Sequence, residues 1–161
     1  MLKCDCGGRL RKTVLSQYDF TAFAGISSTL RNVQGLQCDV CHGTTLDGMV
    51  INGTLRAMEI EIAKQPERLS HEHARFLRQR MRLTQQALAE RMSVARETVA
   101  DWERGASTIS PQHDYILRSL AMAHLVETGT VQKEDLLDTM RETRTSFPRK
   151  VGLPILIGKV A

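Results

Sequence analysis

All four cysteines of the chain lie within its first 41 residues, in the pairs Cys4-x-Cys6 and Cys38-x-x-Cys41. The first residues lack the apolar core of a secretion signal, so we expect a cytoplasmic protein. In that reducing compartment, paired cysteines hold a metal more often than they form disulfides. A shared metal centre would tie residues 4–6 to residues 38–41, which restricts the N-terminal part to short elements that return to one point.

The spacing of the cysteines is close to the two-knuckle pattern of a zinc ribbon. We therefore predict a structural Zn²⁺ held by four thiolates, because a closed tetrahedral site leaves no position for a substrate water. Gly7 and Gly43 follow the two pairs, where reversal of the chain favours glycine. The first pair is one residue shorter than a regular knuckle. A redox-active dithiol is the alternative, and His42 is a possible substitute ligand. The predicted metal ligands are Cys4, Cys6, Cys38 and Cys41.

Short β-like runs and frequent glycines predict a β-rich zinc-ribbon domain over residues 1–53. The runs are 13–15, 18–20 and 35–38. From Thr54 the apolar positions recur at helical spacing, and this pattern ends at Gln65-Pro66, because proline cannot continue a helix. We take residues 54–69 as a connecting helix and hinge.

Helical signals dominate the next part of the chain. Ser70 and Thr84 are suitable N-caps, and Ser110-Pro111 places proline at the first helical position. These signals predict a helix after Ser70 and a second over residues 85–92. A third is predicted over residues 96–104 and a fourth from residue 111. Together they form an all-α domain over residues 70–128, and the fold class is α+β.

Residues 129–161 contain a predicted helix over 134–144 and an apolar tail from Val151. An exposed apolar run of this kind usually has a partner, so we expect this segment, or the helices after Gly105, to form a homodimer interface. The alternative is that the tail packs on its own domain.

The string from Leu83 to Gly105 carries the most specific motif. It runs Leu-Thr-Gln-Gln-Ala-Leu-Ala-Glu-Arg-Met-Ser-Val-Ala-Arg-Glu-Thr-Val-Ala-Asp-Trp-Glu-Arg-Gly. It resembles the Cro and phage-repressor (Xre-like) helix-turn-helix. Small Ala89 would let the two helices approach closely, and Val94, Val99 and Trp102 would seal them on the core. Two positions depart from the pattern, because Ser93 replaces the turn glycine and Ala95 lacks a capping oxygen.

In this class the second helix lies in the major groove of operator DNA. Arg96 suits guanine, Glu97 suits the cytosine amino group and Ala100 suits a thymine methyl. Gln85, at the start of the first helix, is placed to bind phosphate. Glu97 and Asp101 have solubility as an alternative role, since acids beside phosphate cost affinity. The predicted DNA-binding set is Gln85, Arg96, Glu97, Thr98, Ala100 and Asp101.

The combination of the two motifs resembles the MqsA/YgiT-type antitoxins, through residues 30–41 and again through residues 70–105. The resemblance implies a zinc domain that binds a toxin, often a ribonuclease, and a dimeric domain that represses the shared operon. The first knuckle departs from the family pattern, and residues 130–161 extend beyond it. The alternative is a stand-alone phage or host repressor whose zinc ribbon serves folding or sensing.

Composition narrows the remaining classes. The formal net charge is +4 and the pI is near 9.1, which favours an anionic partner. No apolar stretch is long enough to cross a membrane, and no nucleophile motif or phosphate loop is present, so we expect neither a membrane protein nor an enzyme. Arginines crowd the helical region, with a solvated face as the alternative role. They are Arg75, Arg78, Arg80, Arg82, Arg91, Arg96 and Arg104.

Overall fold

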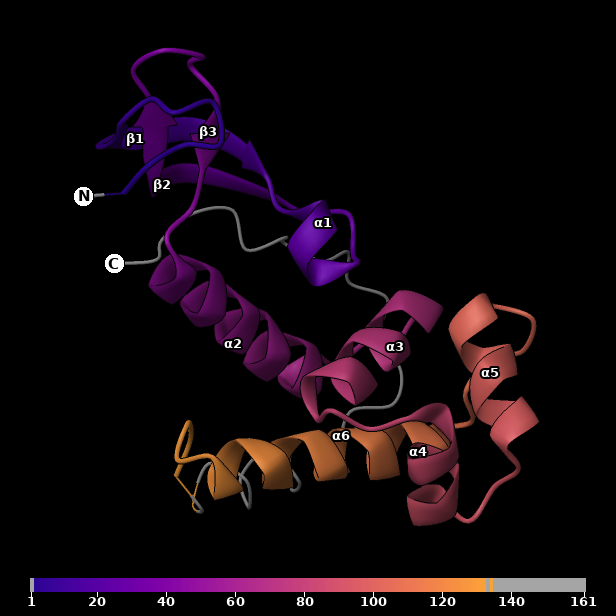
Figure 1. Ribbon diagram of the computed structural model, residues 1–161. Helices are drawn as coiled ribbons and strands as arrows, with labels where there is room; N and C mark the ends of the chain where they lie inside the picture. Colours follow the sequence, from indigo (N-terminus) through magenta and orange to yellow (C-terminus); the bar gives the residue numbers. More distant parts are fainter. Residues whose placement is uncertain (1, 133, 135–161) are drawn as a thin grey trace. The chain divides into compact units, whose positions relative to one another are not determined.

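The computed structural model describes residues 2–132 and 134. The described chain forms two compact units, one up to Leu55 and the other from Arg56 (Figure 1). The first is a small sheet that carries the cysteines and the second is a set of helices, so the fold is α+β as predicted. The predicted helix over 134–144, apart from Glu134, and the apolar tail from Val151 lie outside the described residues.

The first unit is built on a long antiparallel hairpin. Strand β1 (Leu10–Asp19) pairs with β2 (Thr29–Cys38), and the four-residue helix α1 (Thr21–Ala24) lies between them in the chain. A short strand, β3 (Thr44–Thr45), adds to β2 and completes a sheet in the order β1-β2-β3. The hairpin register places Leu10 opposite Cys38, so the chain just after the first cysteine pair meets the start of the second.

Gly35 shows why this sheet closes over such a small core. A side chain at this position of β2 would bring its Cβ to 2.5 Å from Leu15 Cδ1, so only glycine leaves space for Leu15. Leu15, Val33 and Leu36 are buried in the sheet. The close approach of Leu15 to the backbone at Gly35 therefore contributes to the small apolar core of the first unit.

Helix α2 spans Gly48–Lys64 and begins earlier than the predicted start at Thr54. Asp47 explains the difference, because its Oδ1 accepts a hydrogen bond from the backbone N–H of Met49 at 2.8 Å, as an N-capping residue does. The first turns contain Val50, Ile51 and Gly53, which have low helix propensity and hide the helix from a sequence pattern. The helix ends before Pro66, as predicted.

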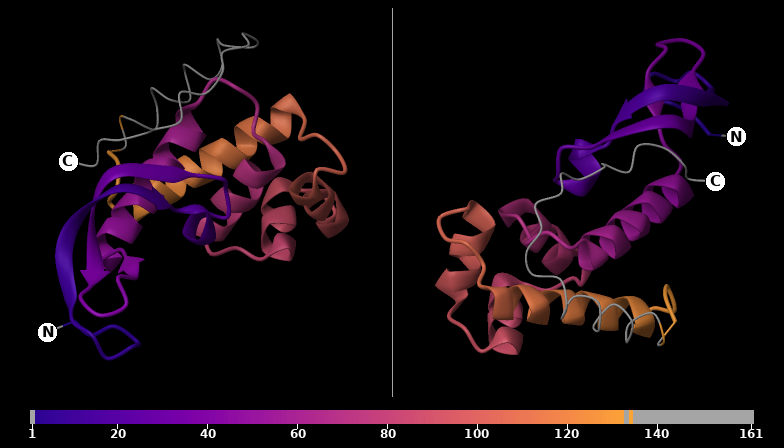
Figure 2. Two further views of the ribbon diagram at one scale, coloured as in Figure 1. Left: turned by 90° about the horizontal axis from the view of Figure 1, so that it is seen from above. Right: turned by 180° about the vertical axis from the view of Figure 1, so that it is seen from behind.

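The second unit contains α3 (His71–Arg80), α4 (Gln85–Met92), α5 (Arg96–Arg104) and α6 (Pro111–Glu127). The three predicted N-caps are present, because the side chains of Ser70, Thr84 and Ser110 each accept a backbone N–H three residues on. The helices enclose an apolar core, and α5 lies at the periphery of the unit in each view (Figure 2). The large apolar side chains that are most completely buried in this core are Leu77, Leu88, Leu117, Met122 and Leu125.

Among residues 2–132, the structure contains no helix that is long and apolar enough to cross a membrane.

Candidate nucleic-acid interface and metal centre

Helices α4 and α5 are joined by a tight turn over residues 93–95. Ser93 takes a left-handed conformation (φ 56°, ψ 43°), as glycine would do at lower cost, and its N–H donates to the carbonyls of Ala89 and Glu90. Ala95 is the N-cap of α5 and makes no side-chain capping bond. Ala89 is buried and Val94 is half-buried, so the packing predicted for the turn is present. Ser93 and Ala95, the two departures from the sequence pattern, therefore leave the packing of α4 on α5 unchanged.

Helix α5 has one sealed face and one open face. Val99, Trp102 and Glu103 are buried against the unit. The side chains of Arg96 and Glu97, in the first turn, are 54% and 78% exposed and lie 3.9 Å apart. The first turn of α5 therefore presents a cation and an acceptor that no core packing uses.

The other predicted contact residues of α5 are less open. Thr98, Ala100 and Asp101 are half-buried. Asp101 is also engaged within its own helix, since its carboxylate accepts a hydrogen bond from Arg104 Nη2. Asp101 thus neutralises a neighbouring arginine, which lowers the repulsion that an acidic residue would add beside phosphate.

A buried carboxylate that the sequence analysis missed fixes α5 on its neighbours. Glu103 is 2% exposed, and Arg78 of α3 donates to both of its oxygens, from Nε at 2.5 Å and from Nη2 at 2.9 Å. Arg75 Nη2 also donates to the Glu103 carbonyl at 3.0 Å. A two-pronged contact of this kind fixes both distance and orientation, so it holds α5 at a set angle to α3. The sequence signal that could have revealed this buried carboxylate is the position of Glu103, directly after Trp102 on the buried side of a predicted helix.

Gln85 belongs to the same network. Its Nε2 donates to Glu103 Oε2 at 2.9 Å. The amide that we expected to bind phosphate is thus directed at a buried carboxylate in this structure, and the Thr84 cap already takes up the Ala87 N–H of the first turn of α4. The role of Gln85 at DNA stays a prediction.

The arginines of this region divide into two groups. Arg78 and Arg80 are paired with the buried carboxylates Glu103 and Glu59, and burial raises the pKa of Glu59 despite its contact with Arg80. The others are exposed. The alternative of a uniformly solvated arginine face is therefore wrong for these two residues. The exposed group consists of Arg75, Arg82, Arg91, Arg96 and Arg104.

In the first unit, the four cysteines form one cluster. Their sulfur atoms all lie within 4.8 Å of one another, with Cys4 Sγ 3.6 Å from Cys41 Sγ and Cys6 Sγ 3.5 Å from Cys38 Sγ. A tetrahedral zinc site with bonds of about 2.3 Å has sulfur-to-sulfur edges of about 3.8 Å. The short knuckle therefore still brings both of its thiols into a set that fits a metal. Among the described residues, His42 is not part of this cluster.

The thiols have unequal acidities because their backbone surroundings differ. The N–H of Cys41, followed by that of Val40, lowers the pKa of Cys38 to about 6. The Gly43 N–H acts in the same direction on Cys41, but the neighbouring Cys6, Cys38 and Cys4 outweigh it and raise the pKa of Cys41 to about 12. Four negative charges cannot coexist in so small a volume without a cation, so full deprotonation of this set calls for a metal ion.

Glycine and left-handed residues shape both knuckles. Gly7 has φ 88°, as its position predicts, whereas after Cys41 the left-handed residue is His42 (φ 57°) rather than Gly43. A side chain at Gly8 would place its Cβ 2.5 Å from Cys38 Sγ. Asp39 joins the two knuckles, because its Oδ1 accepts the Arg9 N–H at 2.8 Å, and this contact lowers the pKa of the carboxyl.

Comparison with known proteins bears on the second unit. Residues 75–113, which include the C-terminal part of α3, all of α4 and α5 and the first residues of α6, match the helix-turn-helix family of DNA-binding regulators. None of the curated proteins matches the chain. The match supports a DNA-binding transcription regulator, and the four clustered thiols are compatible with a metal site.

Proposed function

We propose that this chain is a sequence-specific DNA-binding regulator in which α5 lies in the major groove of its operator. The observation that carries the proposal is the division of α5 into a sealed face, with Trp102 and Glu103, and an open first turn, with Arg96 and Glu97. A helix fixed on one side and open at its N-terminal end is what groove binding by this motif requires.

The residues of the open face have distinct roles in this proposal. Arg96 donates two hydrogen bonds to guanine, Glu97 accepts from the cytosine amino group and Ala100 contacts a thymine methyl. Thr98 and Asp101 border this contact surface. Arg82 and Arg91 are exposed and contribute to the positive potential that attracts the duplex. We further propose a homodimer, because one motif makes few base contacts and two of them span half-sites about 34 Å apart.

Selection of binding sites from random duplex DNA, followed by footprinting on the region upstream of the gene, tests the proposal. We expect enrichment of a two-fold symmetric site and protection of two adjacent major-groove segments. Enrichment of no sequence, together with equal affinity for all duplexes, would contradict sequence-specific regulation and leave only non-specific binding.

For the cysteine cluster we propose a structural Zn²⁺ held by Cys4, Cys6, Cys38 and Cys41. The spacing of the four sulfur atoms, which all lie within 4.8 Å of one another, supports it. Elemental analysis of the protein purified without added metal should give one zinc per chain, and a thiol reagent should react only after chelation. Fast reaction of two thiols in zinc-loaded protein would favour a redox dithiol instead.

We also propose that the chain is the antitoxin of a toxin–antitoxin pair, with the cysteine-bearing unit as the toxin-binding part. The unit is compact and separate from the matched motif, and it exposes the apolar side chains of Val14 (57%) and Val40 (65%). Co-expression with the adjacent small gene tests this idea. We expect that expression of that gene alone arrests growth, and that this chain relieves the arrest by forming a stable complex through residues 1–55. Normal growth on expression of that gene alone would contradict the antitoxin role and favour a stand-alone repressor.

A further inference from the structure

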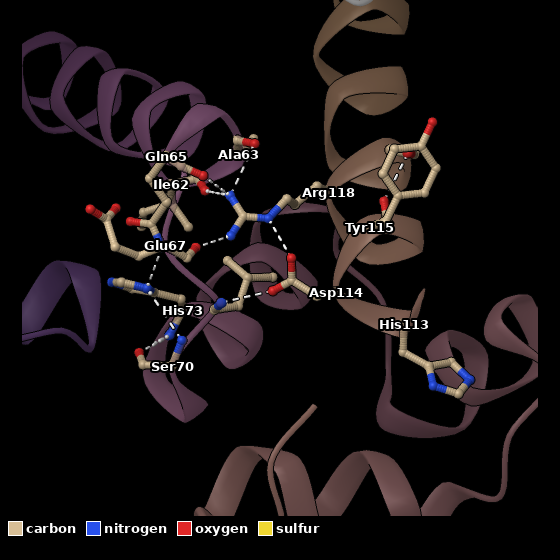
Figure 3. A network of polar contacts seen from close by, with 12 residues as sticks. Ile62, Ala63, Gln65, Glu67, Ser70, His73, His113, Asp114, Tyr115 and Arg118 are labelled. Atoms are coloured by element: carbon tan, nitrogen blue, oxygen red, sulfur yellow. Dashed lines mark hydrogen bonds and ion pairs between the residues drawn. The ribbon is translucent and has the colours of Figure 1, made fainter. Parts of the chain in front are cut away.

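The short segment Gln65–Leu69 joins α2 to α3, and one side chain of α6 holds it. Arg118 is 4% exposed, and its Nη1 donates to the carbonyl oxygens of Ile62 (2.9 Å) and Gln65 (2.6 Å), with Ala63 at 3.3 Å. Its Nη2 donates to the carbonyl of Glu67 (Figure 3). A single guanidinium thus contacts the end of α2 and the segment that follows it.

Asp114 completes this contact from one turn earlier on α6. Its Oδ2 accepts from Arg118 Nε at 2.8 Å, and its Oδ1 accepts from the backbone N–H of Leu69 at 2.7 Å. Both oxygens of a carboxylate that is 2% exposed are therefore used. The two side chains together hold the segment at its start and at its end.

The end of α2 explains why an arginine is needed here. The last carbonyls of a helix have no partner within the helix, and Pro66 has no N–H to offer them. Buried carbonyls without donors are costly, and the helix C-terminus carries partial negative charge. The guanidinium supplies five donors in a planar fork and a full positive charge. A lysine has a single ammonium and cannot reach four carbonyls and a carboxylate together.

Two further contacts join the same elements. The side chain of Gln65, 8% exposed, lies with its Nε2 3.1 Å from Nδ1 of His73, which belongs to the N-terminal cap of α3. One turn before the end of α2, Glu59 accepts from Arg80 of α3 at 3.0 Å. The C-terminal half of α2 is therefore connected to both α3 and α6 by buried polar groups.

We propose that Arg118 is a lock that makes α2 one rigid body with α3–α6. The segment Gln65–Leu69, which the sequence suggests as a hinge, is held fixed in this proposal by the contacts of Arg118 and Asp114. In this proposal Arg118 is a positioning residue, and its role does not depend on DNA binding.

Solution NMR of the full chain tests the proposal in two ways. Residual dipolar couplings of α2 and of α3–α6 should fit one alignment tensor in the wild type. In Arg118→Met, α2 should need a tensor of its own, the Leu69 amide should exchange with solvent roughly 100-fold faster, and trypsin should cut after the exposed Arg68 at a similarly increased rate.

Two comparisons keep the test decisive if Arg118→Met is unstable. The double variant Arg118→Met/Asp114→Asn removes the unpaired buried charge, and we expect the same release of Leu69 while the Leu88 and Val99 amides stay protected. Arg91→Met, at an exposed arginine, should change none of these signals. Unchanged exchange at Leu69, equal loss of protection at Leu88, or α2 aligned separately in the wild type would each overturn the lock.

Discussion

The cysteine-bearing unit and the helical unit maintain their folds by different means. The first buries few large apolar side chains, such as Leu15, Phe20 and Val33, and gathers four thiols at one end of its hairpin. The second encloses a larger apolar core around Leu77 and Leu117. Small units with little apolar surface to bury usually need a metal or a disulfide. Removal of a metal should therefore affect the two units very differently.

Chelation gives the largest expected effect. Structural zinc contributes about 10 kcal/mol or more of apparent binding free energy in small domains, so its removal should unfold the first unit. The helical unit should keep its structure and its affinity for DNA, because its core contains no cysteine. Amide NMR spectra before and after chelation measure both. If the signals of α3–α6 are lost together with those of β1 and β2, the two units share one core.

Within the helical unit, the buried ion pair should matter far more than an exposed one. Glu103→Gln leaves Arg78 buried without a carboxylate, and we expect a loss of about 3 kcal/mol in the free energy of unfolding. Arg104→Gln removes an exposed pair with Asp101 and should cost less than about 1 kcal/mol. Urea denaturation of the metal-loaded protein measures both variants. Equal losses would mean that Glu103 does not fix α5 on α3.

Glycine substitutions should have opposite effects at two positions. Gly8→Ala pushes a methyl group against Cys38 Sγ and should weaken the metal-bound state by about 1 to 3 kcal/mol. Gly53→Ala, on an open face of α2 with nothing within 4 Å, should stabilise by about 0.5 to 1 kcal/mol. Competition with a zinc chelator and thermal denaturation measure the two changes. A Gly8→Ala protein with normal zinc affinity would show that the knuckle adjusts freely.

The smallest effect is expected at the turn between α4 and α5. Ser93 holds a left-handed conformation at a cost of roughly 1 kcal/mol, so Ser93→Gly should stabilise the helical unit by up to that amount. Thermal denaturation should show a higher midpoint, with no change in the first unit. A lower midpoint would mean that glycine's added freedom in the unfolded chain outweighs the strain.

Local signals in the sequence were sufficient to predict most helices of the helical unit. Capping residues and turn chemistry predicted α4 and α5 with their bounds, because these effects act within a few residues. The same kind of signal failed at the start of α2, where β-branched residues and Gly53 lower helix propensity although the helix forms.

The buried polar groups could not be predicted, because their partners come from distant parts of the chain. Arg118 and Asp114 have the spacing of a surface pair on one helix, and nothing local indicates that they hold the end of α2. Gln85 likewise has the position of a phosphate contact, and only the fold shows that Glu103 accepts its amide. The cysteine cluster was predictable because its chemistry requires all four thiols at one point.

The most direct test of the account is the affinity of Arg96→Ala for its selected operator and for random duplex DNA, measured at one fixed salt concentration. Lys64→Ala on α2 removes the same charge and serves as the control. We predict that Arg96→Ala loses about 1 to 3 kcal/mol on the operator and much less on random DNA, so that specificity falls. Equal losses on both DNAs would contradict the assignment of the first turn of α5 to base contact.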